Sequence, residues 1–157
     1  MALDKACEEF QECVTRTFSK MHGLAGLRIG YALAPPDVVE RLSKYQMTLL
    51  GCAGLAAATA SYQDLPFQAF SRARLQESLG ITTAVLRELK LHHVENGRGN
   101  FVFFDTGGSL ADFAAAMRRA GFQIGRPFSP YPSFCRVSMG TVPQMRGFAD
   151  ALRAYFT

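Results

Sequence analysis

The stretch of sequence that decides the fold lies near the start of the chain and reads SKMHGLAGLRIG, residues 19–30. Lys20 follows two hydroxyl residues, Thr17 and Ser19, and precedes a glycine-punctuated turn that ends at Arg28. An amine nucleophile, two hydrogen-bond donors and a permanent cation are thereby gathered in a short length of chain. The alternative is a surface lysine beside a turn, and the Ser-Lys dipeptide taken alone would not exclude it.

The chemistry of these groups points to a phosphorylated aldehyde as the ligand. A lysine amine that is partly desolvated and lies near another cation can form a Schiff base with a carbonyl group. Hydroxyls and a guanidinium are suitable donors to a phosphate. Pyridoxal phosphate combines the two functions, so we expect this cofactor at Lys20.

Composition and charge narrow the class of protein. The chain has 157 residues, of which 48% are hydrophobic and 19% charged, with a net charge of +4, as in one globular domain or two small lobes. We find no basic stretch with interleaved aromatics, no apolar run of membrane-spanning length and no signal peptide, and therefore expect no nucleic-acid or membrane partner. The cysteines lack CxxC spacing and are expected to be free thiols in the cytoplasm, with no metal site: Cys7, Cys13, Cys52 and Cys135.

Apolar periodicity and turn residues predict an alternation of helices and strands, hence an α/β protein. From about residue 90 onward the order is βαβ-like, as in a small α/β lobe. The predicted strands are 14–19, 29–34 (buried), 92–95, 101–104, 123–124 and 135–138. The predicted helices are 36–45, 52–62 (Ala-rich, packed on something large), 67–89 with Phe70, Leu75, Leu79 and Leu86 on one face, 109–119 with Ser109 as N-cap, and 143–155.

The lysine segment resembles a known family motif. Residues 16–31, RTFSKMHGLAGLRIGY, are similar to the cofactor-lysine motif of fold-type I pyridoxal-phosphate-dependent aminotransferases (class I/II). Within them they resemble most closely the histidinol-phosphate aminotransferase branch, which belongs to amino-acid and histidine biosynthesis. Downstream, the Asn-Phe pair at 100–101 and the segments GFQIGR (121–126) and CRVSMGT (135–141) resemble later motifs of that family in the same order.

The resemblance implies a partial fold with two parts. It runs from about residue 14 to near the end of the chain and corresponds to the C-terminal half of the family. Residues 1–65 would be a remnant of the large cofactor-binding domain that carries the lysine. Residues 66–157 would form the small C-terminal α/β domain. The chain is thus expected to be truncated relative to its family.

The resemblance also implies roles for individual residues. Lys20 would attach the cofactor aldehyde and shuttle a proton during the reaction, and the cofactor phosphate would be bound by Thr17, Ser19 and Arg28. In the substrate site, Arg136 matches the arginine that binds the α-carboxylate. Arg126 matches the arginine that helps bind the far acidic group, and Asn100 belongs to the same site.

The sequence departs from the family pattern upstream of the lysine. In the family, an aspartate well before the lysine binds the ring nitrogen of the cofactor. Here Asp4 begins a segment, DKACEEF, that echoes that strand at an interval to Lys20 that is much too short. The loop on the other side of the phosphate and the aromatic ring that stacks on the cofactor are missing.

Three functions therefore remain open. The first is transamination between an amino acid or histidinol phosphate and 2-oxoglutarate, and the second is decarboxylation of a phospho-amino acid on the same fold. The third is a non-catalytic fragment of an aminotransferase. The expected partners are a small amino acid or 2-oxo acid and a second copy of the chain, either as the family homodimer or through self-association of apolar surface left bare by the missing half.

Overall fold

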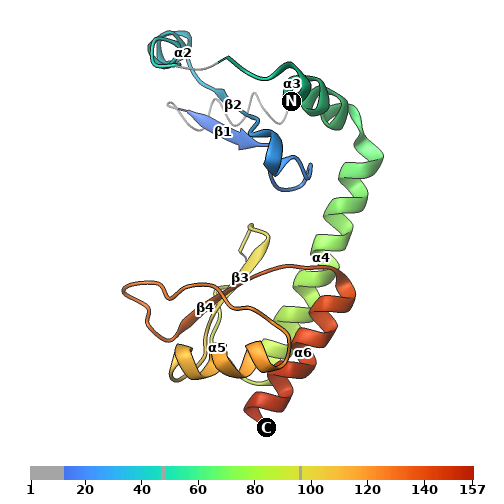
Figure 1. Cartoon of the computed structure of the whole chain (residues 1–157), viewed down its shortest axis with the longest axis vertical. Coiled ribbons are helices and arrows are strands. Elements are labelled where there is room, and N and C mark those ends of the chain that lie inside the picture. The colour runs from blue at the N-terminus through green and yellow to red at the C-terminus, as the bar shows by residue number, and fades with distance from the viewer. Residues whose placement is uncertain (1–12, 47–48, 96) are drawn as a thin grey trace. The chain divides into compact units, whose positions relative to one another are not determined.

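The computed structural model describes residues 13–46, 49–95 and 97–157 (Figure 1). It divides into two compact units, Met1–Ser71 and Arg72–Thr157. The long helix α4, Leu65–Glu88, begins in the first unit and ends in the second. Each unit is mixed α/β and has its own two-stranded antiparallel sheet.

The first unit is organised around a hairpin that frames the lysine segment. Strand β1, Val14–Thr17, pairs antiparallel with strand β2, Gly30–Leu33, from Val14 opposite Leu33 to Thr17 opposite Gly30. A short 3₁₀ helix, η1, Ala25–Leu27, lies in the connection. Gly30 is required at its position because a Cβ there would lie 2.7 Å from the carbonyl oxygen of Arg16 in the paired strand. Both predicted strands are confirmed.

Burial of the second strand was predicted wrongly. Residues along β2 alternate between exposed and half-buried, whereas the apolar run 29–34 predicted a buried strand. Only Ile29, just before the strand, is buried. A two-stranded sheet buries a strand on both faces only if layers cover both sides, and the described part of this unit does not cover both.

Two helices follow the hairpin, as predicted. Helix α2, Pro36–Ser43, starts with proline in its first turn, where the missing N–H costs no hydrogen bond. Helix α3, Cys52–Gln63, packs on the hairpin through Gly54 and Ala58. A Cβ on Gly54 would lie 2.9 Å from the side chain of Ile29, so the glycine allows close approach. The rest of α3 is mostly exposed, and the large partner predicted for it is not among the described residues.

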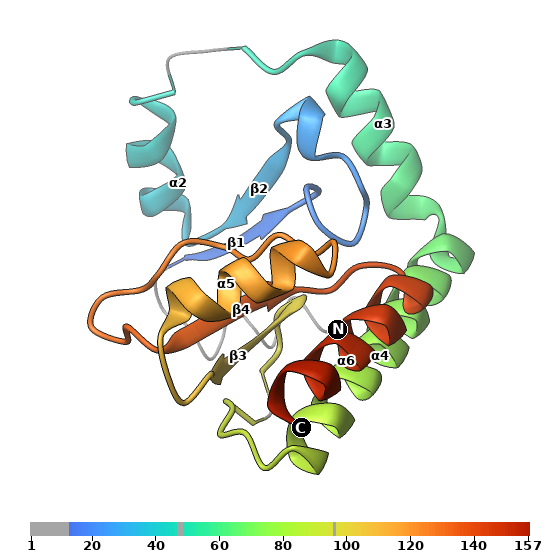
Figure 2. The same cartoon turned by 60° about the horizontal axis from the view of Figure 1, so that its bottom comes forward.

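The second unit places helices against a sheet of two strands. Strands β3, Phe101–Asp105, and β4, Phe134–Ser138, pair antiparallel, from Phe101 opposite Ser138 to Asp105 opposite Phe134. Helix α5, Leu110–Arg119, lies over them, and helix α6, Val142–Phe156, runs alongside the second half of α4 (Figure 2). Arg153 of α6 joins Glu88 of α4 through two hydrogen bonds of 2.9 and 2.8 Å.

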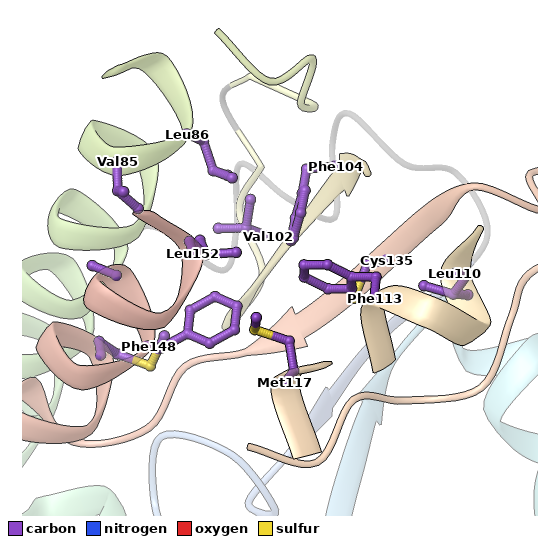
Figure 3. Packing of buried hydrophobic residues seen from close by; sticks show 12 residues of the cluster. Val85, Leu86, Val102, Phe104, Leu110, Phe113, Met117, Cys135, Phe148 and Leu152 are labelled. Atoms are coloured by element: carbon purple, nitrogen blue, oxygen red, sulfur yellow. The ribbon is translucent and has the colours of Figure 1, made fainter. Parts of the chain in front are cut away.

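A continuous apolar core fills the second unit (Figure 3). Every element of the unit contributes to it, and Phe104, Phe113 and Leu152 are completely buried. Phe113 packs edge-on against Phe104 with ring centroids 6.0 Å apart. The other buried members are Val85, Leu86, Val102, Leu110, Met117, Cys135, Met145, Phe148 and Ala149.

The helix boundaries of this unit follow from their caps. Ser109 precedes α5 and its hydroxyl oxygen accepts a hydrogen bond from the Asp112 N–H at 3.3 Å, as predicted. Thr141 and Gln144 form a capping box at the start of α6. The predicted helices 67–89, 109–119 and 143–155 correspond to α4, α5 and α6, and the predicted strands 101–104 and 135–138 correspond to β3 and β4.

Three predictions for this unit are wrong. Residues 92–95 form only an isolated bridge, His93 to Phe104, and residues 123–124 form no strand. The predicted βαβ-like order itself is observed, as β3, α5 and β4, and the two strands pair antiparallel. The buried positions of α4 are Ser78, Thr82, Val85 and Leu86, so only Leu86 belongs to the face predicted from the leucine spacing. Among the described residues, no helix is both long and apolar enough to cross a membrane.

Candidate functional site

The lysine segment lies in the connection that closes the β1–β2 hairpin. Beyond the Thr17–Gly30 pair, the ladder continues with one more bond, from the Phe18 N–H to the Ile29 oxygen at 3.1 Å. Residues 19 and 28 therefore leave the two strands next to each other. The antiparallel pairing thus brings Thr17, Ser19 and Lys20 to the same end of the hairpin as Arg28.

A buried ring fixes the backbone beneath Lys20. Phe18 is buried, and its ring contacts His22 at 4.7 Å and Tyr31 at 5.9 Å between centroids. His22 Nδ1 lies 2.8 Å from the Ser61 hydroxyl, which ties the segment to α3. His22 and Tyr31 therefore support the loop by packing, while the Lys20 side chain is exposed.

A tight turn follows the lysine. The Gly23 N–H donates to the Lys20 oxygen at 2.9 Å, and Gly23 has φ +69°, a value that favours glycine. The Leu24 N–H returns to the Phe18 oxygen at 2.9 Å. These two backbone hydrogen bonds close the turn and fix the path of the chain after Lys20.

The Thr17 hydroxyl and the Arg28 guanidinium both keep hydrogen-bond donors that a ligand could use. The Ser19 N–H donates to the Thr17 hydroxyl oxygen at 3.0 Å, so Thr17 accepts there and can still donate its own hydrogen. Arg28 has left-handed backbone, φ 55°, and its Nη1 donates to the Ala25 oxygen at 2.8 Å, which uses one of its five N–H donors.

This donor set fits pyridoxal phosphate in chemistry: a primary amine for the aldehyde, and two hydroxyls with one guanidinium for the phosphate. The fit covers only the aldehyde and phosphate ends of the cofactor. Asp4, the acidic residue considered for the ring nitrogen, lies outside the described residues.

The second unit carries two arginines that meet on one aromatic ring. The Arg136 guanidinium carbon, from β4, lies 5.2 Å from the centroid of Phe128, and that of Arg126 lies 5.9 Å from the same centroid. Arg136 also lies 5.4 Å from the Phe101 ring centroid. Phe128 itself is held edge-on by Phe103, with centroids 5.5 Å apart.

The charges of these two arginines are not neutralised within the unit. Neither guanidinium forms a salt bridge with a described residue, whereas Arg87 and Arg153 pair with glutamates. Two exposed cations that converge on one ring repel each other unless an anion joins them. This arrangement favours a ligand with one or two acidic groups.

A groove borders one of the two arginines. It has a volume of about 470 Å³, and its lining includes Arg136, Gly125, Gln144, Phe122 and Phe148. Arg126 is not part of its lining. Asn100, the third predicted substrate residue, is half-buried, and its backbone oxygen accepts from the Met139 N–H at 2.8 Å just beyond the β3–β4 ladder.

The sequence analysis did not identify the aromatic residues on which the two arginines stack. Phe128 and Phe101 were not assigned any function, although each is close to one of the predicted arginines in the chain or across the sheet. The spacing Arg126-x-Phe128 was a usable signal, since an arginine two residues from an aromatic ring can stack on it.

The chain belongs to the aminotransferase class I and II family, whose model matches residues 3–152. This family depends on pyridoxal phosphate. The chain is 34% identical over 145 residues to a histidinol-phosphate aminotransferase of Symbiobacterium thermophilum, covering 90% of this chain and 39% of the relative. It is 37% identical over 147 residues to histidinol-phosphate aminotransferase 2 of Methylococcus capsulatus, covering 88% of this chain and 38% of the relative.

Solved structures agree with the family. A candidate histidinol-phosphate aminotransferase from Erwinia carotovora atroseptica matches with a TM-score of 0.86 and 37% identity, covering 91% of this chain and 41% of that one. The histidinol-phosphate aminotransferase of Sinorhizobium meliloti, solved with pyridoxal-5'-phosphate, matches with a TM-score of 0.73 and 26% identity, with the same coverages, 91% and 41%. The chain therefore spans about two fifths of the length of these relatives.

Proposed function

We propose that this chain provides the lysine-bearing part of a pyridoxal-phosphate-dependent transamination site of the histidinol-phosphate aminotransferase type. The reaction would exchange an amino group between an amino acid or histidinol phosphate and 2-oxoglutarate. The observation that carries the proposal is the hairpin end, where the β1–β2 pairing gathers Thr17, Ser19, Lys20 and Arg28. The free thiols of the described part, Cys13, Cys52 and Cys135, fit a cytoplasmic location.

In the first unit, the proposed roles follow from the chemistry of the side chains. Pyridoxal phosphate, when bound, supplies an aldehyde and a ring that withdraws electrons. The Lys20 Nζ would attach the cofactor and afterwards hold the proton that leaves the substrate α-carbon. The hydroxyls of Thr17 and Ser19 and the guanidinium of Arg28 would donate to the phosphate, Arg28 with a charge that does not titrate near neutral pH.

In the second unit, the proposed roles concern the acidic groups of the substrate. Arg136 would bind the α-carboxylate through its planar pair of donors. Arg126 would bind the far phosphate or carboxylate, and Asn100 would add a polar contact. The absence of a carboxylate partner for either arginine among the described residues supports these roles, because the donors remain available.

A second candidate is a non-catalytic aminotransferase fragment. Its support is that the described residues supply donors for only the aldehyde and phosphate ends of the cofactor. A phospho-amino-acid decarboxylase would use the same lysine and arginines, and only its product would differ.

Cofactor binding tests the proposal. We expect the full chain, mixed with pyridoxal phosphate, to give a weak visible band that Lys20→Ala abolishes. Lys44→Ala is the matched control, because Lys44 is an exposed lysine paired with Glu40 at 2.9 Å and has no proposed role. Borohydride reduction followed by peptide mapping should place the label on Lys20. A band that survives Lys20→Ala would contradict the proposal.

The reaction products distinguish the three candidates: the transaminase, the decarboxylase and the non-catalytic fragment. Addition of glutamate should convert the bound cofactor to its amine form if the chain supports transamination, and we expect this conversion to be slow for the chain alone. Release of carbon dioxide after addition of a phospho-amino acid would instead indicate the decarboxylase. A Lys20-dependent band without either reaction would indicate the non-catalytic fragment.

A further inference from the structure

Two serines of the first unit direct their hydroxyls to the residues that follow Lys20. Ser61 lies in α3, and its Oγ is 2.8 Å from Nδ1 of His22. Ser71 lies in α4, and its Oγ donates to the carbonyl oxygen of Met21 at 3.1 Å. The four contact residues are half-buried, whereas Lys20 beside them is exposed. Each of the two residues after the lysine is therefore bonded to a different helix.

These hydroxyls bond outside the helices that carry them. A serine or threonine inside a helix commonly donates to the carbonyl oxygen four residues earlier. Thr59 does so in α3, where its hydroxyl donates to the Leu55 oxygen at 2.9 Å. The Ser61 and Ser71 hydroxyls instead contact residues that are 39 and 50 positions away in the sequence. Their contribution is therefore to the lysine segment and not to α3 or α4.

The corner between α3 and α4 fixes the two serines relative to each other. Gln68 of α4 donates through Nε2 to the Ser61 and Tyr62 oxygens, at 3.1 and 2.9 Å. Asp64, between the helices, accepts from the Phe67 N–H at 2.9 Å through its carboxylate. Side-chain hydrogen bonds thus hold the end of α3 against the first turn of α4. Both hydroxyls are presented to the lysine segment from one braced corner.

The bonds of the two serines differ in kind from those within the turn after Lys20. The Phe18 ring is buried before the lysine, and the Leu24 N–H donates to the Phe18 oxygen at 2.9 Å. Such backbone bonds close the turn but do not attach it to the helices. The Ser61 and Ser71 contacts make that attachment, so they oppose movement of the turn as a whole.

We propose that Ser61 and Ser71 are positioning residues for Lys20, because they hold the turn that carries its amine. The inference rests on the proposed role of Lys20 in attaching the cofactor. A lysine side chain has several rotatable bonds, so its amine meets a carbonyl group more readily when the backbone beneath it is fixed. Loss of one neutral hydrogen bond typically changes such an equilibrium by about threefold to tenfold.

Amide hydrogen exchange followed by NMR tests the restraint without any cofactor. In Ser61→Ala and Ser71→Ala, the Gly23 and Leu24 N–H groups should exchange about threefold to tenfold faster than in wild type. Ser61→Thr and Ser71→Thr retain a hydroxyl and should exchange like wild type. Thr59→Ala is the matched control, because the Thr59 hydroxyl bonds within α3, and it should leave both rates unchanged.

Carbonyl binding tests whether the restraint acts on the amine. Pyridoxal phosphate and pyridoxal, which lacks the phosphate, are titrated separately, and the Lys20-dependent visible band is measured. Each serine-to-alanine variant should weaken binding of both compounds by the same factor, about threefold to tenfold. Arg28→Ala should weaken binding of pyridoxal phosphate only, because the guanidinium is proposed to bind the phosphate.

His22→Phe tests the contact of Ser61. A phenyl ring can keep the packing on Phe18, whose centroid lies 4.7 Å from that of the His22 ring, but it cannot bond the hydroxyl. This variant should therefore match Ser61→Ala in exchange and in binding, and the double variant should be no worse than either single one. Additive effects would contradict a shared contact.

Two further results would overturn the inference. One is exchange of the Gly23 and Leu24 N–H groups at the wild-type rate in both alanine variants. The other is weaker binding of pyridoxal phosphate with unchanged binding of pyridoxal, which would place the effect of the serines at the phosphate. Absence of a Lys20-dependent band in wild type would instead contradict the proposed function, and the exchange rates would still decide whether the serines hold the turn.

Discussion

The guanidinium of Arg136 lies over the ring of Phe128, with its central carbon 5.2 Å from the ring centroid. Arg126 approaches the same ring at 5.9 Å. An exposed cation over an aromatic ring is stabilised by about 0.5–1 kcal/mol. Phe128 therefore gives both arginines a preferred position without neutralising their charge, as a carboxylate would.

Replacement of Phe128 should weaken anion binding. We expect Phe128→Leu to lower the affinity of the chain for 2-oxoglutarate by about threefold to fivefold, because Arg126 loses its stacking ring and Arg136 loses one of its two. Phe128→Tyr, which retains the ring, should bind like wild type. Titration followed by NMR chemical shifts measures both. Equal affinities for Phe128→Leu and wild type would show that the ring does not position the arginines.

Burial in the core of the second unit should dominate stability. Leu152 is fully buried and Leu152→Ala should lower the free energy of unfolding by about 3 kcal/mol, from lost burial and the cavity left behind. Leu55→Ala makes the same chemical change at a half-exposed site and should cost less than about 1 kcal/mol. Urea denaturation followed by circular dichroism compares the two. Similar costs would contradict the closed core described for the second unit.

Asp105 should make stability depend on acid pH. Its pKa lies below the usual value because the carboxylate accepts from the Gly107 N–H at 2.9 Å and from the Ser133 hydroxyl. The unfolded chain then binds a proton at higher pH than the folded chain does, so stability is lost as pH falls below about 4. Asp105→Asn should show a smaller loss between about pH 5 and about pH 2. Urea denaturation midpoints measured across this pH range for wild type and Asp105→Asn test the prediction. The same dependence of the midpoint on pH in both proteins would contradict it.

Cys135 should be chemically inert in the folded chain. Burial raises the pKa of its thiol to about 12, so roughly one molecule in ten thousand carries the reactive thiolate at about pH 8. Cys13 and Cys52 are exposed and should be alkylated first. Iodoacetamide labelling with peptide mapping measures the order, and denaturant should bring Cys135 to the rate of the others. Rapid labelling of Cys135 without denaturant would contradict its burial.

Local patterns in the sequence predicted most elements correctly, because their causes are local. The Ser109 cap, the proline at the start of α2 and the turn residues around Lys20 act within a few positions of themselves. The lysine motif pointed to its family through resemblance of its residues to a known motif, and that family is confirmed by the match over residues 3–152.

The incorrect predictions concern strand pairing and helix burial, which depend on contacts between residues far apart in the chain. The strand predicted at 92–95 had the right residue types, but its pairing with β3 is limited to the His93–Phe104 bridge and the two backbone hydrogen bonds on either side of it. The leucine spacing of α4 predicted one buried face, whereas packing against α6 and the sheet selected Ser78, Thr82 and Val85 instead. Burial depends on which surface lies opposite, and a helix does not encode that surface in its own sequence.

The sequence by itself determined the lysine motif, the order of helices and strands, and the family. The tertiary structure alone decided that the strands of the second unit run antiparallel, that Arg126 and Arg136 meet at Phe128, and that the apolar sides of α3 face solvent. The physical reason is range: propensity, capping and motif chemistry act over a few residues, whereas strand pairing, ring stacking and burial join residues that only the folded chain brings together.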